Sequence, residues 1–325
     1  MPLKGRTAGW TRGGHRPTGP AGRAGAAASR LPDGTKGLLL VGTGVLLLSP
    51  DALVIRLLDL DAGTLLFFRG AFSVVGYLAI LQLLSGGALR ARTWALSRSE
   101  LLVGCLFVIA NVFFVLAIQN SNAALALVIF ASAPAITTLI GRAVGFERVP
   151  RRTWIASTIV LAGVAAIFLT EPRGGSWLGA AAALGGSLAL ATTLVVRRAG
   201  DVRVLPSQAA GALFTGIVAL PFASPLATSG EDLRLALFAG LLLLPVATAM
   251  IMHGPRYLTA PEVSLLLLLE SILGPLWIWI ALGDPPTEQA VLAGALILGT
   301  LATHSVLAER ALRRGRGATS ASSLG

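Results

Sequence analysis

Charged residues are scarce in this chain of 325 residues: they make up 13% of the sequence, whereas hydrophobic residues make up 54%. A soluble globular domain carries about 25% charged residues, because these residues cover its surface. The mean hydropathy of +0.78 agrees with the low charge. The composition therefore excludes one or two water-soluble domains and predicts an integral membrane protein with several transmembrane segments.

Cysteine, lysine and histidine are also rare, and each absence excludes a class of site. The single cysteine, Cys105, lies in an apolar run, so an intrachain disulfide is excluded and a thiolate metal site is not expected. The two lysines, Lys4 and Lys36, do not belong to a Gly-x4-Gly-Lys-Ser/Thr phosphate loop. With three histidines in the whole chain, no metal site and no cofactor are expected. Any transport would draw its energy from a gradient or from a partner protein.

Residues 1–36 differ in composition from the rest of the chain. They are rich in glycine, proline and basic residues and contain no apolar run. Such a segment cannot bury a core, so we predict a disordered basic tail, with a second tail over residues 311–325. The N-terminal tail lacks the apolar centre of a signal peptide, and a transit peptide is the alternative interpretation of its arginine content.

From residue 37 onward, apolar runs alternate with short polar breaks. A bilayer core about 30 Å thick is crossed by about 20 helical residues. The runs therefore predict an all-α fold with ten transmembrane helices, numbered here as spans one to ten. They cover residues 38–57, 64–84, 101–120, 123–142, 153–171, 177–196, 206–226, 234–254, 261–282 and 288–308.

The net charge of +11 follows this predicted topology. With the N-terminal tail in the cytoplasm, nearly all of the 26 basic residues lie on the cytoplasmic side, the exceptions being Arg56, Arg69, Arg173 and Arg234. Cytoplasmic loops of membrane proteins carry an excess of Lys and Arg. The bias predicts that both termini are cytoplasmic, in what we expect to be a bacterial cytoplasmic membrane. It also accounts for the positive charge without a nucleic-acid partner.

The two halves of the chain share short patterns. Ala133-Pro134 and Gly145-Phe146-Glu147 in the first half correspond to Gly274-Pro275 and Gly283-Asp284-Pro285 in the second. The spacing predicts that residues 37–171 and 176–310 are two five-helix repeats. Because each repeat has an odd number of spans, the second would insert upside down. Inverted repeats of this kind are typical of secondary transporters.

The motifs resemble those of the EamA-type transporters of the drug/metabolite transporter superfamily. The resemblance covers about residues 37–310 and rests on Phe67-Phe68-Arg69-Gly70, on Pro134 with Gly145-Phe146-Glu147, and on the segment from Ala260 to Trp277. Asp284 is a departure, because family members usually have glutamate there. The resemblance implies ten helices around a central cavity lined mainly by helices 1, 3, 4, 6, 8 and 9. It also implies transport of amino acids, metabolites or drugs, generally coupled to an ion gradient.

Glu270 is the leading candidate for a functional group, because ionisable side chains at membrane depth are costly. It follows five leucines and lies near the middle of span nine. Burial in a medium of low dielectric favours the neutral form of a carboxyl group, so Glu270 is a candidate carrier of a proton or cation. The alternative is a neutral glutamic acid that is hydrogen-bonded within the bundle.

Other polar residues in the spans have two interpretations each. Asp51 and Arg69 are predicted to form a structural ion pair, although Asp51 is also a candidate contact for a cationic substrate at the outer mouth. Asn111 is a candidate for contact with the solute, and His253 for proton transfer. Trp277 is either an interfacial anchor or a pocket residue. The predicted substrate and ion pathway thus comprises Glu270, Asn111, His253, Asp51 and Trp277.

Pro134 and Pro275 occupy matching positions in the two repeats and are candidate hinges, because proline permits a bend in a transmembrane helix. Together these patterns predict a secondary transporter of small polar or amphipathic organic solutes, working by alternating access with a proton or sodium ion. A monomer and a homodimer both agree with the sequence. A membrane-embedded lipid-modifying enzyme is the alternative, and a passive channel is a third hypothesis.

Overall fold

The computed structural model describes residues 32–85, 95–120, 123–145 and 177–283, together with single positions or pairs between 151 and 162 and between 288 and 303. Within these ranges all regular secondary structure is helical. The tails over 1–31 and 311–325 lie outside the described residues, as do nearly all of predicted spans five and ten.

Seven helical segments are long and apolar enough to cross a membrane, and they coincide with predicted spans one, two, three, six, seven, eight and nine. The protein is therefore an integral membrane protein. Predicted span four consists of two shorter helices, α6 (Ala123–Phe130) and α7 (Ala133–Ala143). The seven segments are Asp33–Leu57, Ala62–Leu84, Arg98–Asn120, Trp177–Ala199, Val204–Phe222, Gly230–Arg256 and Ala260–Leu282.

The first span begins at Asp33, inside the segment that composition assigns to the tail. Pro32 precedes the first turn, where the missing N–H of a proline does no harm, and Asp33 lies where the helix dipole favours a carboxylate. The ammonium group of Lys36 lies 3.1 Å from the carboxylate of Asp33. Local signals at the end of the helix therefore extend it beyond its apolar run.

Four spans are interrupted near their middle. Span one consists of α2 (Asp33–Leu48) and α3 (Asp51–Leu57), and span nine consists of α13 (Ala260–Leu267) and α14 (Glu270–Leu282). Span four is broken between α6 and α7. Span eight consists of α11 (Gly230–Phe238), the π-helical segment η4 (Ala239–Leu243) and α12 (Leu244–His253).

Proline marks three of these four interruptions. Pro50, Pro134 and Pro245 lie at the start of α3, α7 and α12. A proline interrupts a helix because it donates no backbone hydrogen bond and its ring clashes with the preceding turn. The break in span nine has no proline: it falls at Leu268 and Leu269, whereas Pro275 lies well inside α14. The two prolines that match in the sequence repeats thus differ in their position relative to the breaks.

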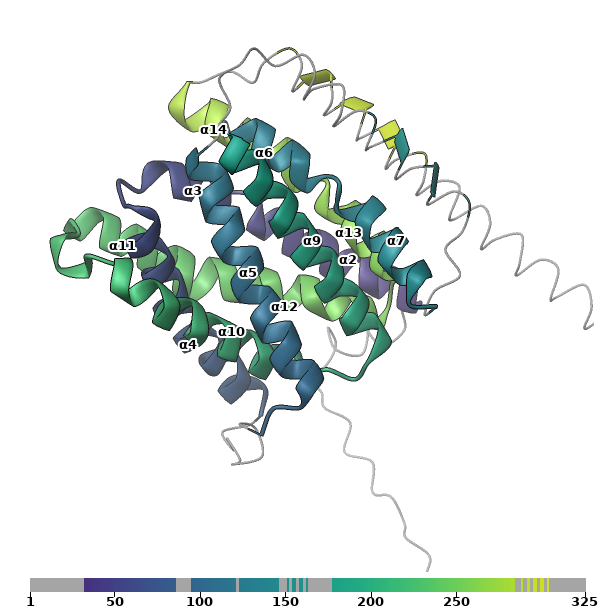
Figure 1. Ribbon diagram of the computed structural model, residues 1–325, viewed down its shortest axis with the longest axis horizontal. Helices are drawn as coiled ribbons and strands as arrows, with labels where there is room; N and C mark the ends of the chain where they lie inside the picture. Colours follow the sequence, from purple (N-terminus) through teal and green to yellow (C-terminus); the bar gives the residue numbers. More distant parts are fainter. Residues whose placement is uncertain are drawn as a thin grey trace, which may run out of the picture.

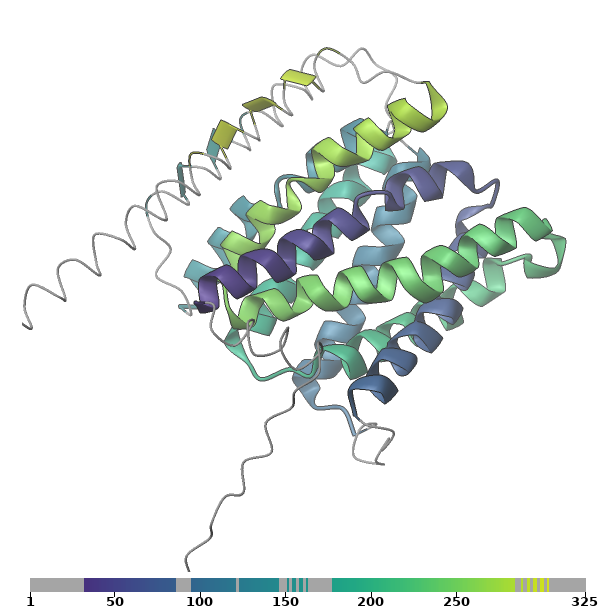
Figure 2. The same cartoon turned by 180° about the vertical axis from the view of Figure 1, so that it is seen from behind.

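The contacts between the described transmembrane segments follow a closed ring. Figures 1 and 2 show this bundle of helices from two opposite sides. Helix α10 (Val204–Ala219) packs between α4 (Ala62–Leu84) and α5 (Arg98–Asn120), and α5 packs on α9 (Trp177–Ala199). Helix α9 contacts α6 and α7, which in turn contact α14 and α13. Span one packs against span nine and against α12, and span eight closes the ring on α4.

Glycine allows the closest crossings in this ring. A Cβ atom on Gly70 of α4 would lie 2.4 Å from the backbone nitrogen of Gly216 in α10. A Cβ atom on Gly211 of α10 would lie 2.7 Å from the carbonyl oxygen of Gly104 in α5. Small residues let transmembrane helices approach closely, so α10 is fixed against both neighbours.

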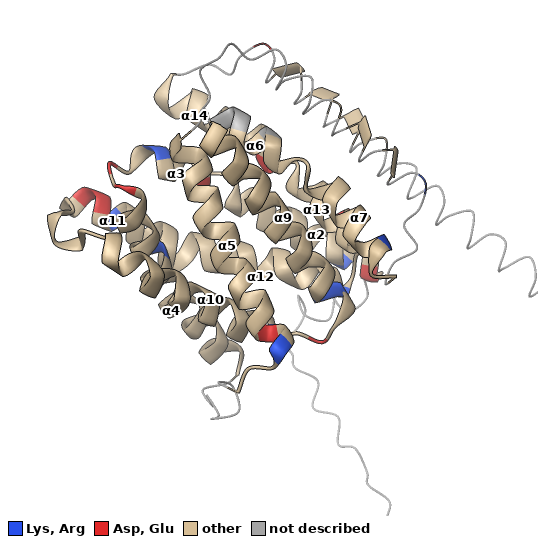
Figure 3. Ribbon diagram, in the orientation of Figure 1, with Lys and Arg blue, Asp and Glu red and all other residues tan. Residues whose placement is uncertain are grey.

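The two ends of the ring differ in charge (Figure 3). At the end where α3 and α11 meet, the described charges are mostly acidic, and the backbone N–H of Asp59 donates to the carboxylate of Asp232 at 3.3 Å. At the opposite end, where α9 and α12 terminate, the described charges are mostly basic, and Arg198 donates to the carbonyl oxygen of Pro255 at 2.9 Å. The asymmetry agrees with the charge bias seen in the sequence.

Candidate functional site

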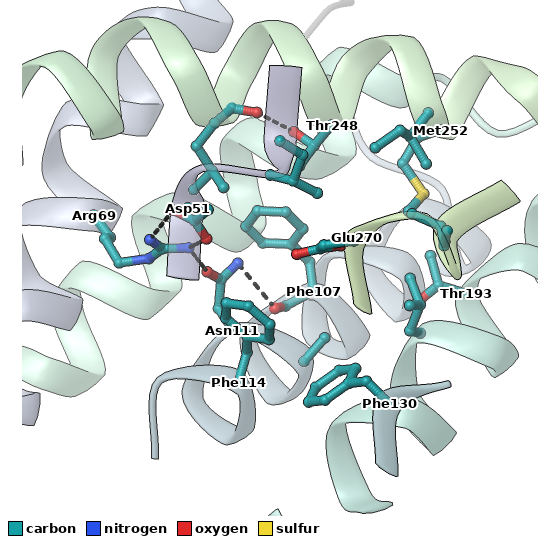
Figure 4. Close-up of a pocket in the computed structure, with 16 residues that line it drawn as sticks. Asp51, Arg69, Phe107, Asn111, Phe114, Phe130, Thr193, Thr248, Met252 and Glu270 are labelled. Atoms are coloured by element: carbon teal, nitrogen blue, oxygen red, sulfur yellow. Dashed lines mark hydrogen bonds and ion pairs between the residues drawn. The ribbon is translucent and has the colours of Figure 1, made fainter. Parts of the chain in front are cut away.

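A cavity of about 120 Å³ lies inside the ring, where the four interrupted spans meet (Figure 4). Leu48 and Asp51 flank the break in span one, and Phe130 precedes the break in span four. Leu244 follows the π-helical segment of span eight, and Glu270 follows the break in span nine. Irregular backbone at membrane depth is tolerated where it is buried in protein or lines a cavity. Helices α4, α5 and α9 supply the other walls.

Asp51 and Arg69 form a buried bidentate ion pair in the wall of the cavity. Arg69 donates from Nη1 and Nη2 to the two carboxylate oxygens of Asp51 at 2.6 and 2.9 Å, and the exposed fractions of the two side chains are 2% for Asp51 and 4% for Arg69. Nη2 of Arg69 also donates to Oδ1 of Asn111 at 3.4 Å, and Nε of Arg69 is buried without a partner. The three residues join α3, α4 and α5, and the charges of Asp51 and Arg69 neutralise each other.

Glu270 is the third ionisable residue in the lining, and its surroundings differ from those of the pair. It begins α14 directly after the break, and its side chain points into the cavity (Figure 4). Among the residues that the structure describes, none forms a hydrogen bond or an ion pair with its carboxyl group. A carboxyl group taken out of water without a partner is costly. Glu270 therefore has unused capacity to bind a proton or another cation.

Aromatic and aliphatic side chains make up most of the remaining wall. Phe107, Phe114 and Phe130 line the cavity, and the rings of Phe114 and Phe130 meet edge to face with centroids 5.2 Å apart. Ligand sites are commonly apolar with a few polar groups that fix orientation. The cavity has this composition.

Two threonine hydroxyl groups complete the lining and are already used as donors. Thr193 donates to the carbonyl oxygen of Ala189 at 2.8 Å, and Thr248 donates to that of Leu244 at 2.6 Å. The hydroxyl group of Tyr77 lies 2.6 Å from Oγ1 of Thr248, and because the proton of Thr248 is used, Tyr77 is the donor. The threonines therefore offer the cavity acceptor lone pairs rather than protons.

A smaller cavity of about 20 Å³ lies between the breaks of spans four and nine, and Glu270 lines it as well. Next to it, Ser271 donates to the carbonyl oxygen of Leu127 at 2.8 Å, which ties α14 to α6. A Cβ atom on Gly274 would lie 2.5 Å from Cδ1 of Leu127, so the two helices touch closely here. The interrupted parts of spans four and nine thus support each other.

A third cavity, of about 10 Å³, continues toward the basic end of the ring and shares Phe107, Thr193 and Met252 with the large one. Gln208 of α10 lines it with 1% exposure, and neither polar atom of its side chain has a partner. Arg197 closes the far side by donating to the carbonyl oxygens of Met252 and Val202.

Gln208 and Arg197 are functional-site residues that sequence reasoning alone does not single out. Gln208 falls at the start of predicted span seven, where a polar residue is expected at the membrane interface, and Arg197 was counted with the positive charge of the cytoplasmic loops. The one indication in the sequence is that glutamine is rare within an apolar run. The burial of Gln208 follows from the packing of α10 against α4 and α5.

Two predicted pathway residues lie outside the linings of the three cavities. His253 ends α12 half-buried, with Nδ1 2.7 Å from the carbonyl oxygen of Ala249. Trp277 is 38% exposed and donates from Nε1 to the hydroxyl oxygen of Ser49 at 2.9 Å. Trp277 thereby joins α14 to the break in span one.

The acidic end of the ring is fixed by a capped helix. Asp61 accepts hydrogen bonds from the backbone N–H and the hydroxyl group of Thr64 at 2.9 and 2.6 Å. The hydroxyl oxygen of Thr64 accepts from the backbone N–H of Ser224 at 2.8 Å. The hydrogen bond from the Thr64 side chain lowers the pKa of Asp61 below its ordinary value of 3.8.

Comparisons with known proteins identify a fold and no more. No protein-family model matches the sequence, and no curated protein is similar to it. Twenty-one chains of solved structures are similar to it. One, described only as the crystal structure of a protein, superposes with a TM-score of 0.68 and 19% sequence identity, over 85% of this chain and 98% of that chain. Among the described residues, no group of three or more His, Cys, Asp or Glu is placed to hold a metal ion.

Proposed function

We propose that this protein is a secondary transporter of small polar or amphipathic organic solutes, of the EamA type, that works by alternating access. One observation carries the proposal: four interrupted spans meet at a central cavity that contains a carboxyl group without a partner. In transporters with discontinuous helices, the substrate and coupling-ion sites lie near the bilayer midplane at such breaks.

The contacts of the ring support two inverted repeats. The exchange of spans one to four with spans six to nine, in order, maps the contacts of the ring onto one another. The contact of span seven (α10) with span three (α5) becomes the contact of span two (α4) with span eight. The contact of span three (α5) with span six (α9) becomes the contact of span eight (α12) with span one (α2). The contact of span six with span four becomes that of span one with span nine. The contacts between spans two and seven and between spans four and nine map onto themselves. A pseudo-two-fold axis through these two contacts accounts for the pattern.

The direction of the spans agrees with this interpretation. Helix α6 packs against α14 and α7 against α13, so spans four and nine run antiparallel, as corresponding spans of inverted repeats must. At the other self-paired contact, Gly70 and Gly216 face each other. The cavity is lined by spans one, three, four, six, eight and nine, which are those that the EamA resemblance implies, with Arg69 added from span two.

The charge asymmetry supports an orientation in the membrane. The end of the ring with Arg142, Arg197, Arg198, Arg203 and Arg256 would face the cytoplasm, because positively charged segments are retained there. This orientation places both termini in the cytoplasm, for which a bacterial cytoplasmic membrane is the proposed location. Since the ring closes within one chain, a monomer suffices for the proposed mechanism.

The breaks and Glu270 together suggest a coupling mechanism. Rocking of one repeat against the other would bend the interrupted spans where they have the fewest regular hydrogen bonds, and would open the cavity to each side in turn. Glu270 would exchange a proton for the solute, because a lone carboxyl group at membrane depth is stable only when it is neutral or paired. Sodium is the alternative coupling ion.

The two rival functions receive less support. A lipid-modifying enzyme would hold its ionisable groups at one face of the membrane, whereas Asp51, Arg69 and Glu270 line the interior cavity. A passive channel would need a continuous pathway, whereas Arg197 links α9 to α12 at one end of the ring.

Reconstitution into lipid vesicles tests the proposal against both rivals. A panel of labelled cationic, zwitterionic, anionic and neutral solutes is offered under an imposed pH or sodium gradient, and the vesicle contents are identified by mass spectrometry. Accumulation of an unchanged solute above its external concentration supports the transporter. Equilibration without accumulation would indicate a channel, and a chemically converted solute would indicate an enzyme.

A further inference from the structure

We infer that the central cavity selects a small primary amine in its ammonium form, attached to an apolar body about the size of a benzene ring. The inference rests on the proposed transport function for the same site, and it names the substrate class that the cavity would accept. Three independent features of the lining lead to it: its charge balance, its hydrogen-bonding groups and its apolar walls.

The charge balance of the lining favours one cation. Three lining residues carry ionisable side chains, namely Asp51 of α3, Arg69 of α4 and Glu270 of α14, and the lining residues from α5, α6, α9 and α12 carry none. Arg69 is neutralised by the two oxygens of Asp51. An ionised Glu270 therefore leaves one uncompensated negative charge, which a single ammonium group would balance. A protonated Glu270 leaves the cavity neutral without a solute.

The hydrogen-bonding groups of the lining are mostly acceptors. The hydroxyl protons of Thr193 and Thr248 are donated to carbonyl groups of their own helices. The oxygen of Thr193 is left to accept, and that of Thr248, which already accepts from Tyr77, has one lone pair left. The carboxyl group of Glu270 also accepts when it is ionised. An ammonium group has three donors and no acceptor, so it complements this set.

A carboxylate group finds no comparable partner in the cavity. Arg69 is the sole cationic side chain among the described lining residues, and both of its Nη atoms already donate to Asp51. Its Nε has no partner but is buried, out of reach of a solute in the cavity. A solute carboxylate would have to displace Asp51 and leave that carboxyl group buried without its partner. Amino acid zwitterions and organic acids are therefore disfavoured relative to amines of the same shape.

The apolar walls set the size and character of the rest of the solute. The volume of about 120 Å³ is of the same order as the roughly 150 Å³ of an engineered protein cavity that admits benzene. Phe107, Phe114 and Phe130 offer aromatic faces and edges to a ring, and a ring face near an ammonium group attracts it. One aromatic or branched aliphatic ring with a short amine arm fills this space.

Benzylamine and three relatives of the same ring test the inference on the purified full-length protein. Benzyl alcohol lacks the charge, benzoate reverses it, and phenylglycine adds a carboxylate to the amine. Thermal unfolding is measured with each probe, because a ligand that binds the native state raises the apparent stability. We expect benzylamine to bind at least about tenfold more tightly than the other three, since a hydrogen bond to a charged group contributes that much.

Two variants and one labelling experiment locate the effect. Glu270→Gln should abolish the preference for benzylamine, whereas Glu231→Gln, an exposed substitution on α11, should retain it. In wild-type protein, benzylamine should protect Glu270 from esterification by an apolar diazo compound, a reagent for protonated carboxyl groups that forms no activated acyl group for an amine to attack, and phenylglycine should not. This last measurement requires no variant to fold.

The outcomes separate this inference from the proposed function. Equal or tighter binding of phenylglycine or benzoate overturns the amine specificity. Benzylamine binding that survives Glu270→Gln, with no protection of Glu270 from the diazo compound in the wild type, overturns it as well. Transport of zwitterions or anions in vesicles without transport of amines also overturns it while leaving the transporter intact. Glu270-dependent amine binding with no flux of any solute in vesicles would instead preserve the binding site and refute the transport function.

Discussion

Removing one member of the Asp51–Arg69 pair should destabilise the protein far more than removing both. Arg69→Gln leaves the Asp51 carboxylate buried, with an exposed fraction of 2%, and without either of its two hydrogen bonds at 2.6 and 2.9 Å. Breaking a buried ion pair in this way costs about 3–5 kcal/mol of unfolding free energy. In the double variant Asp51→Asn with Arg69→Gln, two neutral amides replace the pair, and most of that loss should be recovered.

The assay is unfolding in mixed detergent and dodecyl sulfate micelles, followed by helical circular dichroism, for the wild type, both single variants and the double variant. Lys36→Gln is the control, because the exposed Lys36–Asp33 pair spans one helical turn at 3.1 Å and should contribute at most about 0.5 kcal/mol. Strictly additive losses, or a loss below about 1 kcal/mol for Arg69→Gln, would refute the view that the pair is desolvated and mutually dependent.

Three further predictions follow from the packing. Gly76→Ala should lower the unfolding free energy by about 1–3 kcal/mol, because the new Cβ would lie 2.3 Å from the carbonyl oxygen of Leu241 and overpack the contact. Gly42→Ala is the control in the same unfolding assay. It should be neutral or stabilising, because a Cβ atom on Gly42 would have no atom within 4 Å. Gln208→Leu should raise the unfolding free energy by about 1–3 kcal/mol, because two unpaired buried polar atoms disappear, and a measured loss of stability would show that Gln208 has hidden partners. Asp61→Ala should cost about 1 kcal/mol as a lost helix cap. Because the pKa of Asp61 is lowered in the folded state, the stabilisation by the ionised cap should be complete above pH 3.8 and should vanish as the pH falls through the lower folded-state pKa. Acid unfolding of the wild type and of the Ala variant, compared over this pH range, measures the loss.

Much of the fold could be predicted from hydropathy because long apolar runs determine where helices cross the membrane. The seven spans long enough to cross it match the predicted ones to within a few residues at most ends. The interruptions were harder to foresee. Pro50, Pro134 and Pro245 mark three of them, but the break before Glu270 lies in a run of leucines with no helix-breaking residue. Packing against α6, with Ser271 bonded to the carbonyl oxygen of Leu127, accompanies that break, and a single sequence does not reveal such a contact.

The candidate site was only partly accessible to sequence reasoning. Rarity within the membrane singled out Glu270, Asp51, Arg69 and Asn111, and the structure brings all four together around one cavity. The ion pair of Asp51 with Arg69 is present as predicted, and both residues line the same cavity as Glu270. The aromatic wall could not be recognised in advance, since phenylalanine is common on any apolar helix. Whether a phenylalanine lines the cavity depends on which face of its helix points to the centre of the ring.

The most direct test of the account is whether solute movement carries protons through Glu270. Vesicles containing the wild-type protein and an internal pH indicator are exposed to a gradient of a solute that the purified protein binds. The account predicts a solute-dependent change in internal pH for the wild type and for Glu231→Gln, and none for Glu270→Gln. An equal pH change with Glu270→Gln, or solute flux in the wild type without any pH change, would contradict it.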